Sequence, residues 1–145
     1  MLSIKLQVSS QMAQPIIRRE GKIFKVNFII TPTNVNSPGN GNPYVAGGDT
    51  LDMTQLFNLL SSSPGQVLPS FETPIEVRLR SQPNAPGPAA EFKYRFCQGA
   101  TLQTCTMQVL TGAAAQSGLT ELSAGNYPAG VLADVIVGTA EFLMP

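Results

Sequence analysis

The residues of this chain that are best suited to chemistry are a Gly-Gly-Asp run and a few pairs of carboxylates. The stretch PYVAGGDTLDMT, residues 43–54, places Gly47 and Gly48 directly before Asp49, with Asp52 three residues further on. A phosphate-binding loop would continue with Gly-Lys-Ser/Thr, and a dinucleotide fingerprint would lie between a strand and a helix. The spacing of the two aspartates also lacks the oxygen-rich pattern of an EF-hand loop. We therefore interpret the run as a sharp turn, in which both glycines take a positive φ and Asp49 caps the turn.

Paired carboxylates are the remaining candidates for acid–base work, because the chain contains no histidine. Without histidine there is no Ser-His-Asp or Cys-His pair, and two cysteines cannot fill an ordinary zinc site. Asp49 and Asp52 would face opposite ways on a strand, whereas Glu72 and Glu76 would share a face but have Pro74 between them. We interpret both pairs as solvated charges. The sequence therefore predicts a protein that is not an enzyme and that binds no cofactor and no metal.

The two cysteines flank QGATLQT, which has the composition of a hairpin tip. Aligning the apolar faces of the flanking strands places Phe96 opposite Cys105 and Tyr94 opposite Met107. In that register the sulfurs of Cys97 and Cys105 point to opposite faces of the sheet. We predict two free thiols, with Cys105 in the core, in agreement with assembly in a reducing cytoplasm.

Alternation of apolar and polar residues is the dominant pattern along the chain, and it is typical of half-buried strands. It predicts strands over residues 2–8, 24–30, 75–80, 92–97 and 106–109, with shorter ones possible at 15–18, 50–53 and 118–122. The last segment, ADVIVGTAEFLM, is apolar on both faces, which predicts either a central strand or one pressed against another subunit. In MTQLFNLLSSSPG the leucines have helical spacing, and Pro64-Gly65 would end that helix.

Two long segments rich in Pro, Gly and Asn separate these elements and are predicted to be loops. They are TPTNVNSPGNGNP at 31–43 and SQPNAPGPAA at 81–90. Seven or eight short strands with long loops and at most one short helix predict an all-β protein. We expect a jelly-roll-like β-sandwich that forms a single domain over residues 1–145.

The charge composition limits the partners of the protein. Only 12% of the residues are charged, and nine basic side chains balance nine acidic ones. This balance argues against nucleic acid as the main partner, and no apolar run is long enough to span a membrane. The N-terminal residues do not resemble a signal peptide, so we expect use without export. Two interpretations of the low charge stay open: a polar, uncharged surface, or a surface that meets other protein subunits.

Two stretches of the sequence resemble a set of small tailed-phage virion proteins. PYVAGGDTLDMT is similar to their Y-x-x-GGD-x-L-D signature, and ELSAGNYPAGVLADVIVGTAEF is similar to the end of their chains. That end has an A-G-x-YP-A turn, a D-x-(Ile/Val) strand start and a last apolar strand that ends in Phe. The matching residues here are Leu122, Ala124, Gly125, Tyr127, Pro128, Ala129, Asp134, Ile136 and Phe142. Residues 55–118 have no match, and LMP replaces the basic residues that usually follow the last Phe.

The resembled proteins are encoded near the major capsid gene and are treated as capsid decoration, or cement, proteins. The resemblance implies a jelly-roll-like subunit, commonly a homotrimer, made in the host bacterial cytoplasm and placed on the outer surface of the capsid in the virion. Its partners would be the major capsid protein and other copies of itself. Binding would be multivalent and would not be catalytic.

Contacts to the capsid or to other subunits are expected mainly in loops. The candidate residues are Tyr44, Gly47, Gly48 and Asp49 after the first loop, Asn84 and Pro86 in the second, and Leu2 and Ile4 in a first strand able to extend a neighbour's sheet. The alternative is that the GGD and YP motifs only shape turns.

Other functions are also compatible with the sequence. The chain could be another virion component, such as a head–tail joining or tail protein. It could also be a carbohydrate- or receptor-binding β-sandwich, which should expose aromatic side chains, and Tyr44 and Tyr127 are its only loop tyrosines.

Overall fold

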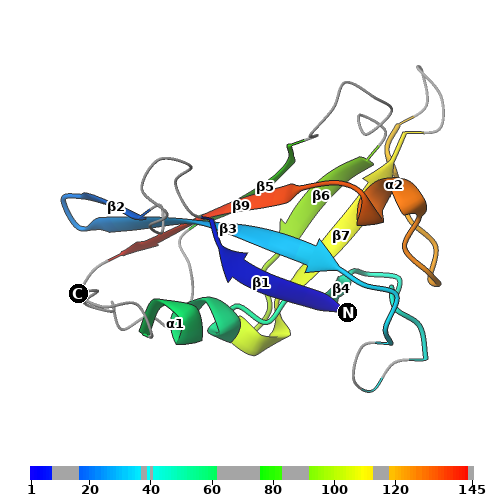
Figure 1. The fold of residues 1–145 in the computed structure, drawn as a ribbon, viewed down its shortest axis with the longest axis horizontal. Coiled ribbons are helices and arrows are strands. Elements are labelled where there is room, and N and C mark those ends of the chain that lie inside the picture. The colour runs from blue at the N-terminus through cyan, green and yellow to red at the C-terminus, as the bar shows by residue number, and fades with distance from the viewer. Residues whose placement is uncertain are drawn as a thin grey trace.

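The computed structural model of the chain describes residues 1–7, 17–36, 39, 41–61, 76–82, 92–112 and 118–143. These residues form nine strands in two antiparallel sheets, together with two short α-helices (Figure 1). The predicted all-β sandwich is therefore confirmed. Neither of the described helices is long and apolar enough to cross a membrane.

The first sheet has the strand order β1-β3-β9-β5, with β2 also paired to β3. Its strands are β1 (Leu2–Leu6), β2 (Ile17–Glu20), β3 (Ile23–Pro32), β5 (Glu76–Ser81) and β9 (Ile136–Leu143). β1 and β2 pair with successive parts of one edge of β3, while β9 pairs with its other edge. Because β9 lies between β3 and β5, the final apolar segment is a central strand, which was one of its two predicted roles.

The second sheet has the order β4-β7-β6, with β8 also paired to β7. Its strands are β4 (Asp49–Thr50), β6 (Phe92–Cys97), β7 (Thr106–Thr111) and β8 (Thr120–Glu121). The predicted register of the β6–β7 hairpin is wrong by two residues, because Phe96 pairs with Met107 and not with Cys105. A shift of two residues keeps every side chain on its face. Cys105 is accordingly buried in the core, and both cysteines are free, as predicted.

The connection between β6 and β7 is longer than predicted and contains a 3-10 turn, Leu102–Thr104. Hydrogen bonds between Thr101 and Thr104 hold this turn together. The Thr101 N–H donates to the Thr104 hydroxyl oxygen at 3.0 Å, and the Thr104 hydroxyl donates to the Thr101 carbonyl at 3.1 Å. Alignment of the apolar faces had assigned Thr104 and Cys105 to the second strand, but the turn includes Thr104 and ends at Cys105. The turn therefore accounts for the change of register.

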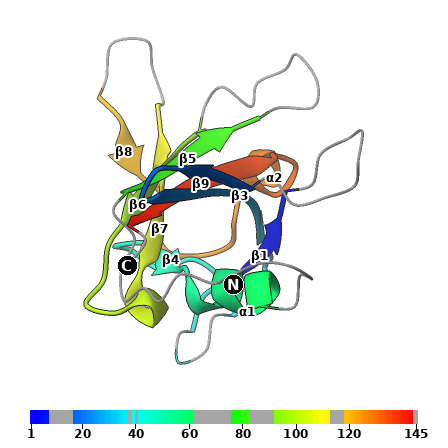
Figure 2. The ribbon, with the colours of Figure 1, turned by 90° about the vertical axis from the view of Figure 1, so that its left-hand side faces the viewer.

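Helix α1 (Thr54–Ser61) lies within the segment predicted to be helical and covers one side of the sandwich. Its start is fixed by Asp52, whose carboxylate accepts the Thr54 N–H at 2.9 Å. Leu56 and Leu60 are buried, and Figure 2 shows α1 beside β1 and close to β4. The predicted end at Pro64-Gly65 lies outside the described residues. The single turn of α2 (Ala129–Leu132) was not predicted, because four residues give no periodic signal.

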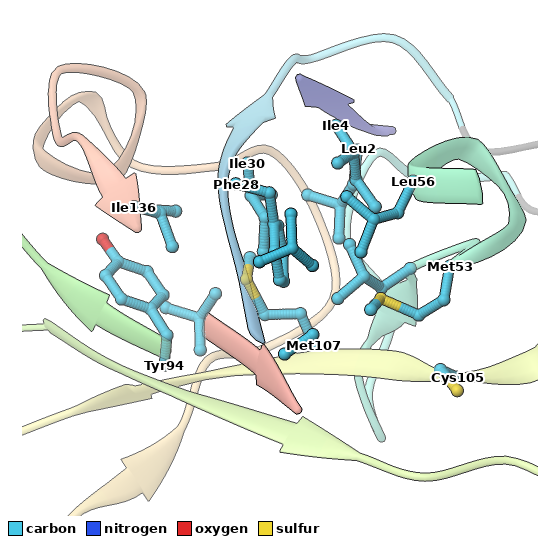
Figure 3. Close-up of a cluster of buried hydrophobic side chains, with 14 of the residues drawn as sticks. Leu2, Ile4, Phe28, Ile30, Met53, Leu56, Tyr94, Cys105, Met107 and Ile136 are labelled. Carbon is cyan, nitrogen blue, oxygen red and sulfur yellow. The ribbon is translucent and has the colours of Figure 1, made fainter. Parts of the chain in front are cut away.

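The core lies between the two sheets and is closed by α1. Figure 3 shows Phe28 and Ile30 of β3 facing Met107 of β7, with Leu56 of α1 beside them. Across the first sheet, Phe28 is opposite Gly138 of β9, where any added Cβ would collide with the Phe28 ring. The absence of a side chain at this position leaves room for the aromatic ring in the core.

Candidate functional site

The two stretches that resemble virion proteins meet in the folded chain. Tyr44 and Gly125 form an antiparallel bridge, in which the Tyr44 N–H donates to the Gly125 carbonyl at 2.9 Å and the Gly125 N–H donates back at 3.0 Å. The rings of Tyr44 and Tyr127 pack edge to face with centroids 5.5 Å apart. We call the cluster of Tyr44, Asp49, Glu121, Gly125 and Tyr127 the motif junction.

The Gly-Gly turn has the backbone that the sequence predicted, but a different residue caps it. Gly47 and Gly48 have φ of 94° and 107°, which favours glycine at both positions. A Cβ on Gly48 would also lie only 3.0 Å from the Met107 carbonyl oxygen. The Asp49 carboxylate accepts the Thr50 N–H directly after the glycines at 2.9 Å, but it does not accept the Gly47 N–H. The Gly47 N–H donates to Glu121 Oε1 at 2.6 Å, because the Asp49 side chain is directed into the interior.

The interpretation of Asp49 as a solvated charge is wrong, because its carboxylate is fully buried and hydrogen-bond donors surround it. It accepts the Tyr127 hydroxyl at 2.8 Å and the Thr50 N–H at 2.9 Å. The Met1 amino nitrogen lies 3.2 Å from the same carboxylate and also donates to the carbonyls of Thr33, Val35 and Pro43. A buried carboxylate is tolerated only with such donors. The role of Asp49 in this chain is therefore to fix the junction internally.

Glu121 is the junction residue that sequence reasoning missed. Its Oε1 accepts the Tyr44 hydroxyl at 2.9 Å as well as the Gly47 N–H. The Tyr44 hydroxyl oxygen in turn accepts the Val109 N–H at 3.1 Å. Glu121 opens the quoted stretch ELSAGNYP, so its position was visible, but no local pattern predicts a partner 77 residues away.

Asp134, which begins the D-x-Ile motif, joins the two sheets at another place. It accepts the Ser81 hydroxyl of β5 at 2.7 Å and the Tyr94 hydroxyl of β6 at 2.7 Å. Each of the three tyrosines in the chain therefore donates its hydroxyl to a carboxylate. Burial, and then the neighbouring carboxylate, raise the pKa of Tyr94 and of Tyr127 far above its usual value. Burial likewise raises the pKa of Tyr44, against an opposing hydrogen bond from Val109.

Most of the predicted contact residues that the structure describes lie in the interior. Leu2 and Ile4 are 4% and 8% exposed and pack in the core, and Tyr44 and Asp49 are fully buried. Gly48 is also buried, whereas Gly47 is exposed. The other two candidates, Asn84 and Pro86, lie outside the described residues.

The free edge of β1 is protected in this chain. The Ile4 N–H points away from β3 and donates to the Gln55 side-chain oxygen of α1 at 3.1 Å. Native sheets commonly cover an edge in this way, which prevents pairing with another strand. The structure thus brings the candidate residues of β1 against α1 and leaves their strand poorly placed to extend a neighbour's sheet.

The loop after β3 is held against the motif junction. Asn34 Oδ1 accepts the Tyr127 N–H at 2.7 Å, and the Met1 amino group donates to the Val35 carbonyl. The Val35 side chain is 57% exposed, the largest exposure among the large apolar side chains that the structure describes. The Val35 side chain and the exposed Gly47 therefore lie at the surface beside the motif junction, on backbone that hydrogen bonds hold in place.

The outward face of the first sheet holds a second group of polar side chains. The register places Asn27 beside Thr139 and Lys25 beside Glu141. The Thr139 hydroxyl donates to Asn27 Oδ1 at 3.1 Å, and Lys25 Nζ lies 3.5 Å from Glu141 Oε1. A cavity of about 220 Å³ opens there, lined by Arg18, Lys25, Asn27 and Thr139. These residues come from three strands, so only the pairing register brings them together.

The part of the chain that the structure describes contains no group of three or more Cys, Asp or Glu side chains placed to hold a metal ion. No protein-family model, curated protein or solved structure matches the chain. The function proposed below therefore depends on the geometry of the chain and on the resemblance of its two motifs.

Proposed function

We propose that this protein is a non-enzymatic structural component of a tailed-phage virion. It binds the outside of the capsid, contacts the major capsid protein, and joins neighbouring capsomers. The observation that supports this most directly is the motif junction. The GGD and YP stretches, which carry the resemblance to decoration proteins, are bonded to each other through Tyr127 and Asp49 and through Tyr44 and Gly125. The two stretches that carry the resemblance therefore form one structural unit of the fold.

The junction serves this function as a rigid support. Three hydrogen bonds, accepted by Glu121, Asn34 and Asp49, fix the loop after β3 and the Gly-Gly turn to the end of the sandwich. A contact loop that is already ordered loses less conformational entropy when it binds. Each subunit then adds a modest contact area at a defined angle to its neighbours.

Several weak contacts from one subunit act together. A subunit that touches two capsomers makes its second contact at a high effective concentration, so the shell gains more than either contact alone provides. Because the protein binds the assembled shell and not its free parts, it shifts the equilibrium toward assembly. A homotrimer would multiply this effect, and we propose that state for the protein on the capsid.

The structure weighs against the carbohydrate-binding alternative. Tyr44, Tyr94 and Tyr127 are all 7% exposed or less, and their hydroxyls are engaged with carboxylates. Sugar-binding sites commonly use exposed aromatic faces, which these three side chains do not offer. No feature of the described residues specifically favours a head–tail joining or tail role.

Removal and re-addition of the protein tests the proposal. Particles of the phage that encodes the chain should lose the protein under mildly destabilising treatment while the shell stays intact. Such shells should then release DNA at a lower temperature, and the purified protein should restore the original temperature. Loss of tails or of infectivity with unchanged shell stability would contradict the proposal and favour a head–tail or tail component.

A further inference from the structure

The described side chains on the outward face of the first sheet carry a net positive charge, although the chain is neutral as a whole. Among the side chains that the structure describes there, five are basic and two are acidic. They are Lys5, Arg18, Lys25, Arg78 and Arg80, against Glu76 and Glu141. Four other acids that the structure describes accept hydrogen bonds elsewhere in the fold: Asp49, Asp52, Glu121 and Asp134. A neutral composition thus conceals a face with positive potential.

The cavity on this face has the donors that an anion needs. Arg18 contributes a guanidinium from β2, and Lys25 contributes an ammonium from β3. Asn27 accepts the Thr139 hydroxyl through Oδ1, so its Nδ2 remains the donor end of that amide. At about 220 Å³, the cavity has room for an acidic side chain but not for a larger cofactor.

A buried acceptor lies beside the cavity. The Gln7 N–H donates to the Asn27 carbonyl at 3.0 Å, which places Gln7 opposite Asn27 on the same face of the sheet. Gln7 Oε1 is buried, and no donor from the described residues reaches it. A buried polar atom without a partner is unfavourable, so this acceptor is a local cost of the fold beside Asn27.

We propose that this cavity binds the carboxylate of an acidic side chain on a partner protein. The carboxylate contacts Arg18 and Lys25, and Asn27 Nδ2 is a further donor in the lining of the cavity. A carboxylate fits better than a phosphate, because Lys25 is already engaged with Glu141 at 3.5 Å and the Arg18 guanidinium can bind a carboxylate through two parallel N–H bonds. Nucleic acid would need a longer series of cations along its backbone. Any acidic protein surface meets these requirements, so the inference holds whether or not the partner is a capsid.

Peptide titration of the isotope-labelled protein tests the site. The probe is acetyl-Gly-Glu-Gly-amide, with acetyl-Gly-Gln-Gly-amide and inorganic phosphate as comparisons. The amide resonances of Gln7, Asn27 and Thr139 should shift saturably with the glutamate peptide, and the glutamine peptide should bind about tenfold more weakly, as expected when a charged hydrogen bond is lost. An absence of saturable shifts, or tighter binding of phosphate than of the glutamate peptide, would overturn the proposal.

Two charge-matched variants make the test specific. Arg18→Gln and Arg95→Gln each remove one exposed cation, but Arg95 lies on β6 in the other sheet. Arg18→Gln should weaken binding of the glutamate peptide about tenfold, and Arg95→Gln should change it less than about twofold. Equal effects of the two variants would show general charge attraction and would also overturn the proposal. Because the assay contains no capsid, its result is independent of the proposed function.

Discussion

The hydroxyl of Tyr127 donates a hydrogen bond to the buried carboxylate of Asp49 at 2.8 Å, across 78 residues of sequence. This bond joins the YP motif to the GGD motif, and it gives the buried charge one of its donors. Replacing either residue changes a contact within the fold and leaves the outer surface almost unchanged. The pair is therefore a direct test of whether these motifs act through the structure of the junction.

Tyr127→Phe should destabilise the protein by about 1–3 kcal/mol, because Asp49 stays buried and loses a donor. Asp49→Asn should also destabilise, but the double variant should lose less than the sum of the two single losses, because the two residues are in contact. Urea unfolding of the four proteins measures this coupling. Strictly additive losses would contradict a direct bond between the residues.

Strong base should unfold the protein through its tyrosines. Their pKa values are raised in the folded state, so each tyrosine stays neutral in the fold while it ionises near pH 10 in the unfolded chain. The unfolded state then binds fewer protons, and stability is present below about pH 10 and falls as the pH rises above it.

The slope of the free energy of unfolding against pH tests the contribution of each tyrosine. Each one should contribute up to about 1.4 kcal/mol per pH unit, so Tyr127→Phe should lower the slope by about a third. Urea unfolding between about pH 9 and pH 11 measures the difference, and the titration of lysines is common to both proteins. An unchanged slope in Tyr127→Phe would show that this hydroxyl is not kept neutral by the fold.

The two glycines of the turn should differ in their tolerance of alanine. Gly47→Ala adds only the strain of a positive φ, about 1–2 kcal/mol, because a Cβ there meets nothing within 4 Å. Gly48→Ala adds the same strain and an overlap with the Met107 carbonyl and the Thr106 hydroxyl at 3.0 Å, so it should cost more, about 3 kcal/mol.

Gly118→Ala is the matched control for these variants. Gly118 has no positive φ, and a Cβ there would meet no described residue within 4 Å, so alanine should be neutral or slightly stabilising. Thermal unfolding of the three variants gives the ranking. If Gly47→Ala proved as damaging as Gly48→Ala, the close approach of β7 to Gly48 would have no part in the turn.

Gln55→Ala should expose the edge of β1. The Ile4 N–H would lose its acceptor, with a loss of about 1 kcal/mol, and the strand would become available for pairing with another chain. Sedimentation velocity should then reveal more self-association than in the unaltered protein. Gln55→Glu keeps an acceptor oxygen and should behave like the unaltered protein, whereas identical behaviour of the two variants would refute edge protection by this residue.

Most of the longer strands were predictable because one face of each is buried, which imposes a period of two on the sequence, whereas β9 was recognised by apolar residues on both faces. The register of the β6–β7 hairpin was not predictable, since the Thr101 and Thr104 hydroxyls close a local turn that the apolar pattern does not reveal. Apolar alternation therefore identified the buried face of each strand correctly, but it gave a β6–β7 register that differs from the observed one by two residues.

The junction was only partly predictable from the sequence. Positive φ at Gly47 and Gly48 follows from local chemistry and was predicted correctly. The partner of Asp49 was assigned to its own turn, whereas Tyr127 competes for the carboxylate from the far end of the chain. Arg18, Lys25 and Thr139 form a cavity only after three strands have paired. Long-range partners of this kind leave no signal in a local pattern.

The number of copies of this protein per virion, relative to the major capsid protein, tests the central claim most directly. Quantitative mass spectrometry of purified particles should find it in a fixed ratio to the major capsid protein, at the level expected when every local symmetry position of the shell is filled. A copy number that corresponds to a single ring at one vertex, or absence from the particles, would contradict a capsid-binding role.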